Sequence, residues 1–163
     1  MTLKKFLRNS LLISFLSGAL QPTFAAENNN NQNSDALIQQ NILTYINQYR
    51  VKHHLNPLKL NSIISAEATK HSQDMATHRI PFGHQYFPER IKYLYAHIKQ
   101  CRAGAENVAF NYKNTQELVK RWTLSPGHQR NIVGNYNLTG IGIARDKNGK
   151  IYYTQMFLRS DAK

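Results

Sequence analysis

The sequence predicts an α/β fold: an α-β-α sandwich with a small, mainly antiparallel central sheet between helices. Two observations carry this prediction. The first half of the chain shows helical hydrophobic periodicity, whereas 139–158 reads as two strands joined by the turn-forming run Asp146-Lys147-Asn148-Gly149. The last strand is bulky on both sides, and a sheet that is apolar on both faces must be covered on both.

Four main helices are expected from apolar spacing and capping residues. The first is predicted over 35–53, where apolar side chains recur at helical spacing. Asn61 can cap a second helix, and Pro88 can open a short third one. Asn114 can cap a fourth helix that ends at Ser125-Pro126, and a further helical turn is expected to begin there.

Three strands are predicted, at 106–110, 139–145 and 150–158. In the second of these, Gly140 and Gly142 fall on one side and make that face nearly flat. A flat strand face lets a helix approach closely, so a helix is expected to pack there.

The N-terminal 25 residues have the pattern of a secretory signal peptide. A positively charged start precedes a short apolar core, and Thr23 and Ala25 are small residues suited to cleavage after Ala25. The asparagine-rich segment 26–34 is predicted to be a linker that buries too little surface to fold. Residues 35–163 are then one domain, without a transmembrane segment, and the mature protein is expected to be secreted or periplasmic.

Charge and cysteine content narrow the partners and the chemistry. The net charge of +12 favours anionic surfaces as partners, but no nucleic-acid-binding module is recognisable, so no specific nucleic-acid partner is expected. Cys101 is the only cysteine, which excludes an intrachain disulfide. In an oxidising compartment it is either buried or paired between molecules, and burial is the favoured interpretation.

Five short blocks of sequence, taken in order, resemble the CAP superfamily: cysteine-rich secretory proteins, antigen 5 and pathogenesis-related proteins. The resemblance is to its bacterial SCP-like extracellular branch and extends from Asn47 to about Phe157. It implies the α-β-α sandwich described above. The blocks are Asn47-Gln48-Tyr49-Arg50, Phe82-Gly83-His84, Ala105-Glu106-Asn107, Ser125-Pro126-Gly127-His128 and the two strands from Gly140 to Phe157.

The resemblance also implies a central cleft that collects two histidines and acidic residues, where several family members bind a divalent metal. By motif, the histidines correspond to His84 and His128, and one acid corresponds to Glu106. Asn107 and Ser125 are expected to be cleft neighbours. Ser125 stands where the family has its second glutamate, so this chain has one carboxylate fewer.

These residue types make chemical sense as an open zinc site. Two neutral imidazoles and one carboxylate can hold zinc or another divalent metal with water in the fourth position. Glu106 alternates with Val108 and Phe110, so it should point to the apolar side and needs a nearby histidine or cation. The same residues could instead form a purely structural network, and the sequence leaves both alternatives open.

Three classes of function fit: a secreted module that binds a lipid, peptide or cell-envelope ligand, a metal-dependent hydrolase acting on peptide or cell-wall substrates, and a structural protein. The missing carboxylate weakens the hypothesis of an enzyme, because a metal site would then lack a separate general base. Ser125 lacks a nucleophile elbow, Cys101 lacks a histidine signature, and no catalytic residue is assigned. We therefore predict a non-enzymatic binding module, with the hydrolase as the alternative. His71, on the apolar stripe of the second helix, is interpreted as a core histidine.

Overall fold

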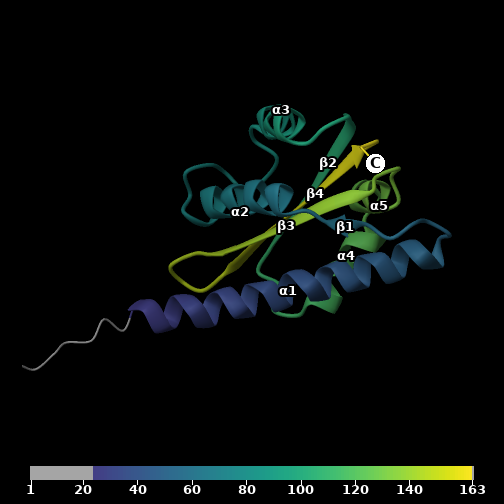
Figure 1. Ribbon diagram of the computed structural model, residues 1–163. Coiled ribbons are helices and arrows are strands. Elements are labelled where there is room, and N and C mark those ends of the chain that lie inside the picture. The colour runs from purple at the N-terminus through teal and green to yellow at the C-terminus, as the bar shows by residue number, and fades with distance from the viewer. Residues whose placement is uncertain (1–23, 163) are drawn as a thin grey trace, which may run out of the picture.

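The computed structural model describes residues 24–162, and its elements follow the predicted order (Figure 1). Of the predicted signal peptide, residues 1–25, positions 1–23 lie outside the described residues. The helices are α1 (Phe24–Lys52), α2 (Ser62–Ala76), α3 (Phe87–His97), α4 (Thr115–Leu124) and α5 (Pro126–Ile132). The strands are β1 (Lys59–Leu60), β2 (Cys101–Phe110), β3 (Leu138–Arg145) and β4 (Ile151–Ser160).

The four strands form one mixed, mostly antiparallel sheet in the order β1-β3-β4-β2. The pairs β3–β4 and β2–β4 are antiparallel, and the two-residue β1 runs parallel to β3. The three longer strands confirm the prediction, although β2 begins at Cys101 rather than at Glu106. The sequence Cys-Arg-Ala-Gly-Ala has few strand-favouring residues, so its pairing with β4 was not evident. Cys101 itself is half-buried, and its thiol donates to the carbonyl of Ile98.

Helices cover both faces of the sheet, which confirms the sandwich. Helices α2 and α3 lie on one face and α1, α4 and α5 on the other (Figure 1). The core on the α1 side includes Ile42, Ile46, Leu118, Trp122, Ile141 and Phe157. The core on the α2 side includes Ile64, Ala68, Leu94, Met156 and Leu158.

The predicted close approach of a helix occurs where α2 crosses β3. A Cβ atom added to Gly140 would collide with the backbone of α2 at Ile64 and Ser65. A Cβ on Gly142 would collide with the α2 backbone at Ala68 and Thr69. The flat face of β3 therefore sets the distance of α2 from the sheet, and with it the position of the side chains that α2 directs toward α3.

The predicted capping residues are confirmed. The Asn61 side chain accepts hydrogen bonds from the first backbone N–H groups of α2, at 3.0 and 3.1 Å. The Asn114 side chain accepts from the N–H of Glu117 at 3.0 Å. Pro126 opens α5 immediately after α4 ends, as the Ser125-Pro126 pair predicts.

Helix α1 differs from its prediction at its start. It begins at Phe24 rather than near Asp35, and so it runs through the asparagine-rich segment that was expected to be an unfolded linker. Once a helix is nucleated, each further residue adds one hydrogen bond at modest entropic cost, so a packed helix can extend through residues that would not start one. The packed part of α1 begins with Ile38 and Ile42.

Arg50 in α1 fastens the segment that follows α5. Its buried guanidinium donates to the carbonyl oxygens of Ile132 at 2.7 Å, Gly134 at 3.0 Å and Tyr136 at 3.0 Å. A fourth hydrogen bond reaches the carbonyl of Asn56 at 2.9 Å. The Asn47–Arg50 block therefore has a structural role, because it fixes α5 and the loop that leads into β3.

Candidate functional site

The candidate site is a cleft along the outer edge of β2, where the two helix layers face each other. It has two adjoining hollows. One, of about 310 Å³, is lined by residues that include His84, Glu106 and Asn131. The other, of about 390 Å³, is lined by residues that include Trp122 and His128.

The carboxylate of Glu106 is buried and is held by Arg90 through two parallel hydrogen bonds. The Arg90 Nε donates to Oε2 at 2.9 Å, and Nη2 donates to Oε1 at 2.8 Å. Such bidentate pairs are among the strongest ion pairs in proteins. The expectation that Glu106 points inward and needs a partner is met, but the principal partner is an arginine that the sequence interpretation missed. A signal existed, because Arg90 lies one turn from Leu94 and these two are the buried residues of α3.

His84 lies in the loop between α2 and α3 and contacts the same carboxylate. Its Nδ1 is 2.8 Å from Oε1 of Glu106, and its side chain is 53% exposed. The preceding residue, Gly83, has a backbone φ of +149°, which residues other than glycine rarely adopt. This backbone geometry lets the loop turn so that His84 faces β2.

His71 in α2 is a second histidine at Glu106, and it was not a predicted site residue. Its Nε2 lies 2.9 Å from the carbonyl oxygen of Gly83 and 3.7 Å from Oε1 of Glu106. Desolvation by burial lowers the pKa of His71, which favours the neutral ring. His71 is buried, as expected of a core histidine, but its Nδ1 atom has no hydrogen-bond partner.

His128 occupies the other hollow. Its Nδ1 is 2.8 Å from Oγ of Ser125, and its ring stacks on Trp122 with centroids 6.2 Å apart. Burial lowers the pKa of His128, and the nearby His84 lowers it further. Ser125 is therefore a direct neighbour of His128, as expected, and offers it a neutral hydroxyl.

Asn107 and Asn131 connect the two hollows. The Asn107 Nδ2 donates to the carbonyl of His128 at 3.2 Å. The Asn131 Nδ2 donates to Oδ1 of Asn107 at 2.8 Å and to the carbonyl of Glu106 at 3.0 Å. These bonds tie α5 to β2 and hold the His128 end of the cleft in place.

The structure thus joins His84 to Glu106 directly, whereas His128 lies in the adjoining hollow and bonds to Ser125. Among the described residues, no three histidine, cysteine, aspartate or glutamate side chains gather closely enough to hold a metal ion. Both oxygens of Glu106 already accept from Arg90, whose positive charge opposes a cation at that carboxylate. In this arrangement, His84, Glu106 and His128 do not fit a shared metal ion.

The hollow at His128 is mainly apolar and aromatic at its rim. Phe82, next to the Gly83 turn, packs against Phe110 at the end of β2 with ring centroids 5.0 Å apart. Phe110 in turn stacks on Tyr152 at 5.9 Å. Both phenylalanine rings remain nearly half exposed. An apolar group that entered this hollow would cover aromatic surface now in contact with water.

Comparison with known proteins agrees with this architecture. The model of the cysteine-rich secretory protein family, CAP, matches residues 43–157. The chain belongs to the CAP family. Every residue of the cleft described above lies within the matched segment.

Several bacterial proteins are similar to this chain in sequence or in structure. The Bacillus subtilis protein YkwD is 31% identical over 122 residues, which cover 74% of this chain and 46% of YkwD. An extracellular SCP-domain protein of Bacillus anthracis superimposes with a TM-score of 0.64 at 23% identity, over 88% of this chain and 45% of that one. An outer surface protein of Borrelia burgdorferi gives a TM-score of 0.63 at 17% identity, over 73% of this chain and 90% of that one. The chain spans less than half the length of YkwD.

Two of the structural relatives are described as an extracellular protein and an outer surface protein. Within residues 24–162, no helix has the length and apolar character needed to cross a bilayer.

Proposed function

We propose that this CAP domain is an exported, non-enzymatic binding module that takes an apolar group of a lipid, peptide or cell-envelope ligand into the hollow beside His128. The observation that carries the proposal is the bidentate contact of Arg90 with Glu106. A carboxylate already occupied in this way is a poor general base and a poor metal ligand. The hydrolase alternative needs that carboxylate free.

The aromatic hollow supports the binding role. Its rim rings, Phe82 and Phe110, are exposed, and Trp122 and Tyr112 also line it. Burying such rings against an apolar ligand is favourable by roughly 25 cal/mol per Å² of area removed from water. The polar pair Ser125 and His128 at the same hollow could hydrogen-bond the ligand and fix its orientation.

The single tryptophan provides a direct test. Trp122 is the only tryptophan in the chain and lines the hollow, so its fluorescence reports occupancy. Titration with dodecanoate should change the emission in a saturable way. Phe110→Ser should weaken this response about tenfold, because it removes one aromatic wall. Tyr93→Ser is the matched control, since Tyr93 is equally exposed, at 44%, but lies on α3 outside this hollow.

Zinc titration separates the binding module from the metal-dependent hydrolase. On our proposal, calorimetry detects no zinc site that needs His84, Glu106 and His128 together. Uptake of one zinc ion that is lost in His84→Ala, Glu106→Gln and His128→Ala alike would instead support the hydrolase. The binding role of the hollow is overturned if neither dodecanoate nor apolar peptides change the fluorescence of Trp122.

A further inference from the structure

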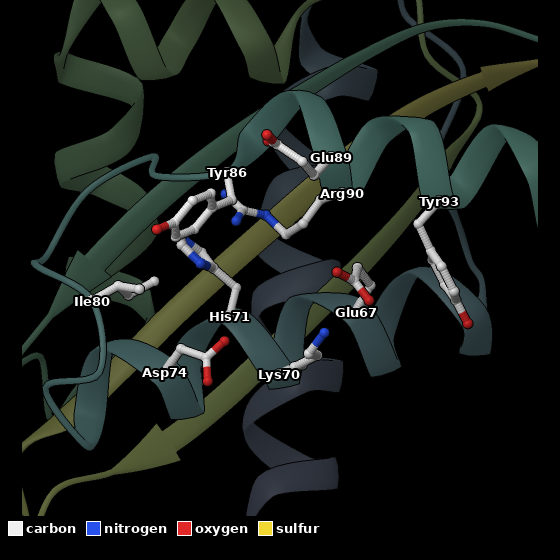
Figure 2. A pocket seen from close by; sticks show the side chains of 9 residues that line it. All are labelled: Glu67, Lys70, His71, Asp74, Ile80, Tyr86, Glu89, Arg90 and Tyr93. Carbon is white, nitrogen blue, oxygen red and sulfur yellow. The ribbon is translucent and has the colours of Figure 1, made fainter.

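A groove between α2 and α3 has a volume of about 410 Å³ and meets the cleft along β2 at His71 and Arg90, which both face Glu106 (Figure 2). Helix α2 contributes Glu67, Lys70, His71 and Asp74 to it. These positions are spaced three and four residues apart, so they form one face of the helix. From Glu67 to Asp74, this face of α2 is polar.

The opposite wall has the same spacing. Tyr86, at the N-terminus of α3, is followed along the helix by Glu89, Arg90 and Tyr93, and all four line the groove. Two helices that face each other ordinarily bury apolar stripes between them. Here α2 and α3 share an apolar cluster that includes Ile64 and Leu94, and beside it polar and aromatic side chains line a groove.

The groove carries both signs of charge, with three acidic and two basic side chains in its lining. Three of the nine acidic residues line it, although the net charge is +12. Asp74 is paired with Arg79 at 2.7 Å, and Arg90 is committed to Glu106. Within the described part of the chain, no ion pair involves Glu67 or Glu89, and Lys70 is the cation that faces them.

His71 supplies the second, independent observation. Its side chain is only 1% exposed and projects from α2 into the groove beneath Tyr86 (Figure 2). Because Nε2 faces two acceptors, the Gly83 carbonyl and Glu106, that nitrogen carries the hydrogen. Nδ1 then presents a lone pair, and this buried atom has no partner. A buried acceptor left unpaired is costly, so a donor is expected at this point.

We propose that this groove binds a primary ammonium group. One ammonium N–H is donated to Nδ1 of His71, and the carboxylates of Glu67 and Glu89 balance the positive charge. The exposed rings of Tyr86 and Tyr93 flank the site and can contact a cation through their faces. This site adjoins the Glu106 cluster through His71 and Arg90, but it shares no lining residue with the hollow beside His128 and does not depend on the function proposed there.

The chemistry of the groove selects this group among cations. A metal ion is disfavoured, because the described residues include no cluster of three suitable ligands. A quaternary ammonium ion carries positive charge but no N–H, so it leaves Nδ1 unpaired. A primary ammonium has N–H donors, one of which can pair with the imidazole acceptor, and the carboxylates that line the groove balance its charge at longer range.

A primary ammonium reaches such a groove either as a free amine or as a lysine side chain of a peptide. Cadaverine represents the first source, and lysine blocked at both its α-amino and carboxyl groups represents the second. Calorimetric titration of the purified protein with both probes compares the two. Tetramethylammonium is the charge-matched probe that cannot donate.

We expect saturable binding of at least one primary amine, and tetramethylammonium should bind at least about tenfold more weakly, because one charge-assisted hydrogen bond is lost. Glu67→Gln combined with Glu89→Gln should weaken amine binding about tenfold or more. Lys70→Met should strengthen it several-fold, since the opposing cation is removed. A gain of affinity is a result that partial unfolding cannot produce.

Two controls place the effect in this groove. Glu117→Gln removes an exposed carboxylate from α4, and His128→Ala alters the cleft along β2; neither should change amine binding. A ring-nitrogen NMR spectrum should show the Nδ1 signal of His71 shifting when the amine is added. The proposal is overturned if neither amine binds to the native protein or to Lys70→Met, or if tetramethylammonium binds as well as the amines.

Discussion

The two ends of the cleft along β2 use their histidines in opposite ways. His84 is half exposed and contacts a buried carboxylate that is already neutralised by Arg90. His128 is held by stacking on Trp122 and by Ser125, beside an apolar hollow. The charges at the His84 end are therefore already paired within the protein. The aromatic surface at the His128 end is free to contact a ligand. Two histidines placed by one family resemblance need not share one chemical task.

The largest effect should come from the aromatic end. Trp122→Ala should cost roughly 4 kcal/mol of unfolding free energy, because it leaves a cavity between α4 and the sheet. The ring is only 2% exposed, and its Nε1 donates to the carbonyl of Val108. Urea unfolding measures this loss. Leu124→Ala, at a 68% exposed position of the same helix, is the control and should change stability by less than about 0.5 kcal/mol.

The second-largest loss of stability is expected at the charged end of the cleft, where Arg90 pairs with Glu106. Arg90→Met leaves the Glu106 carboxylate buried without its bidentate partner, which should cost about 3 kcal/mol at neutral pH. Adding Glu106→Gln should recover part of this loss, since the uncompensated charge disappears. Urea unfolding of the single and double variants tests both statements. A double variant no more stable than Arg90→Met would mean that Arg90 acts through packing rather than charge.

His84→Ala should have a much smaller effect, about 1 kcal/mol or less, because it removes one hydrogen bond from a half-exposed side chain. Arg90 continues to satisfy Glu106 in this variant. The same unfolding experiment decides. If His84→Ala destabilises the protein as strongly as Trp122→Ala, His84 has a mainly structural role, and the contrast between the two ends disappears.

The smallest effect concerns pH. Burial lowers the pKa of His71 and His128 in the folded state, so the unfolded chain binds protons more readily at these positions. Their contribution to stability is present above the unfolded pKa of about 6.5 and is lost as the pH falls toward the folded values. His128→Phe should flatten this decline in a series of urea titrations from neutral to mildly acidic pH. An unchanged slope, with exposed His54→Asn as control, would contradict this assignment.

The sequence predicted the sandwich and its caps because those signals are local. Asn61 and Asn114 precede apolar stripes, and the turn before Gly149 joins two bulky strands. It did not predict the pairing of Glu106 with Arg90, which lies sixteen positions away on a different element. Periodicity reveals that a charged residue falls on a buried stripe, but the partner depends on how α3 packs on β2. The two-residue β1 is also too short to show any alternation.

The same long-range packing explains the incomplete prediction for the site. Motif matches predicted that His84, Glu106 and His128 meet in one cleft as candidate metal ligands, and the structure joins the first two directly. The position of His128 follows instead from Ser125, Trp122 and the backbone bond from Asn107. His71 could not be distinguished from an ordinary core histidine, because only the three-dimensional arrangement reveals an unpaired Nδ1.

The place of β2 at the end of the sheet has a consequence for aggregation. An edge strand offers unpaired carbonyl and N–H groups on which another chain can add a strand. Here two side chains cap carbonyls of this edge: Asn131 donates to Glu106, and Trp122 donates to Val108. The residues that shape the cleft thus also keep β2 from serving as a template. Losing Asn131 and Trp122 together would uncover a strand edge, and the damaged protein would tend to self-associate before it unfolds.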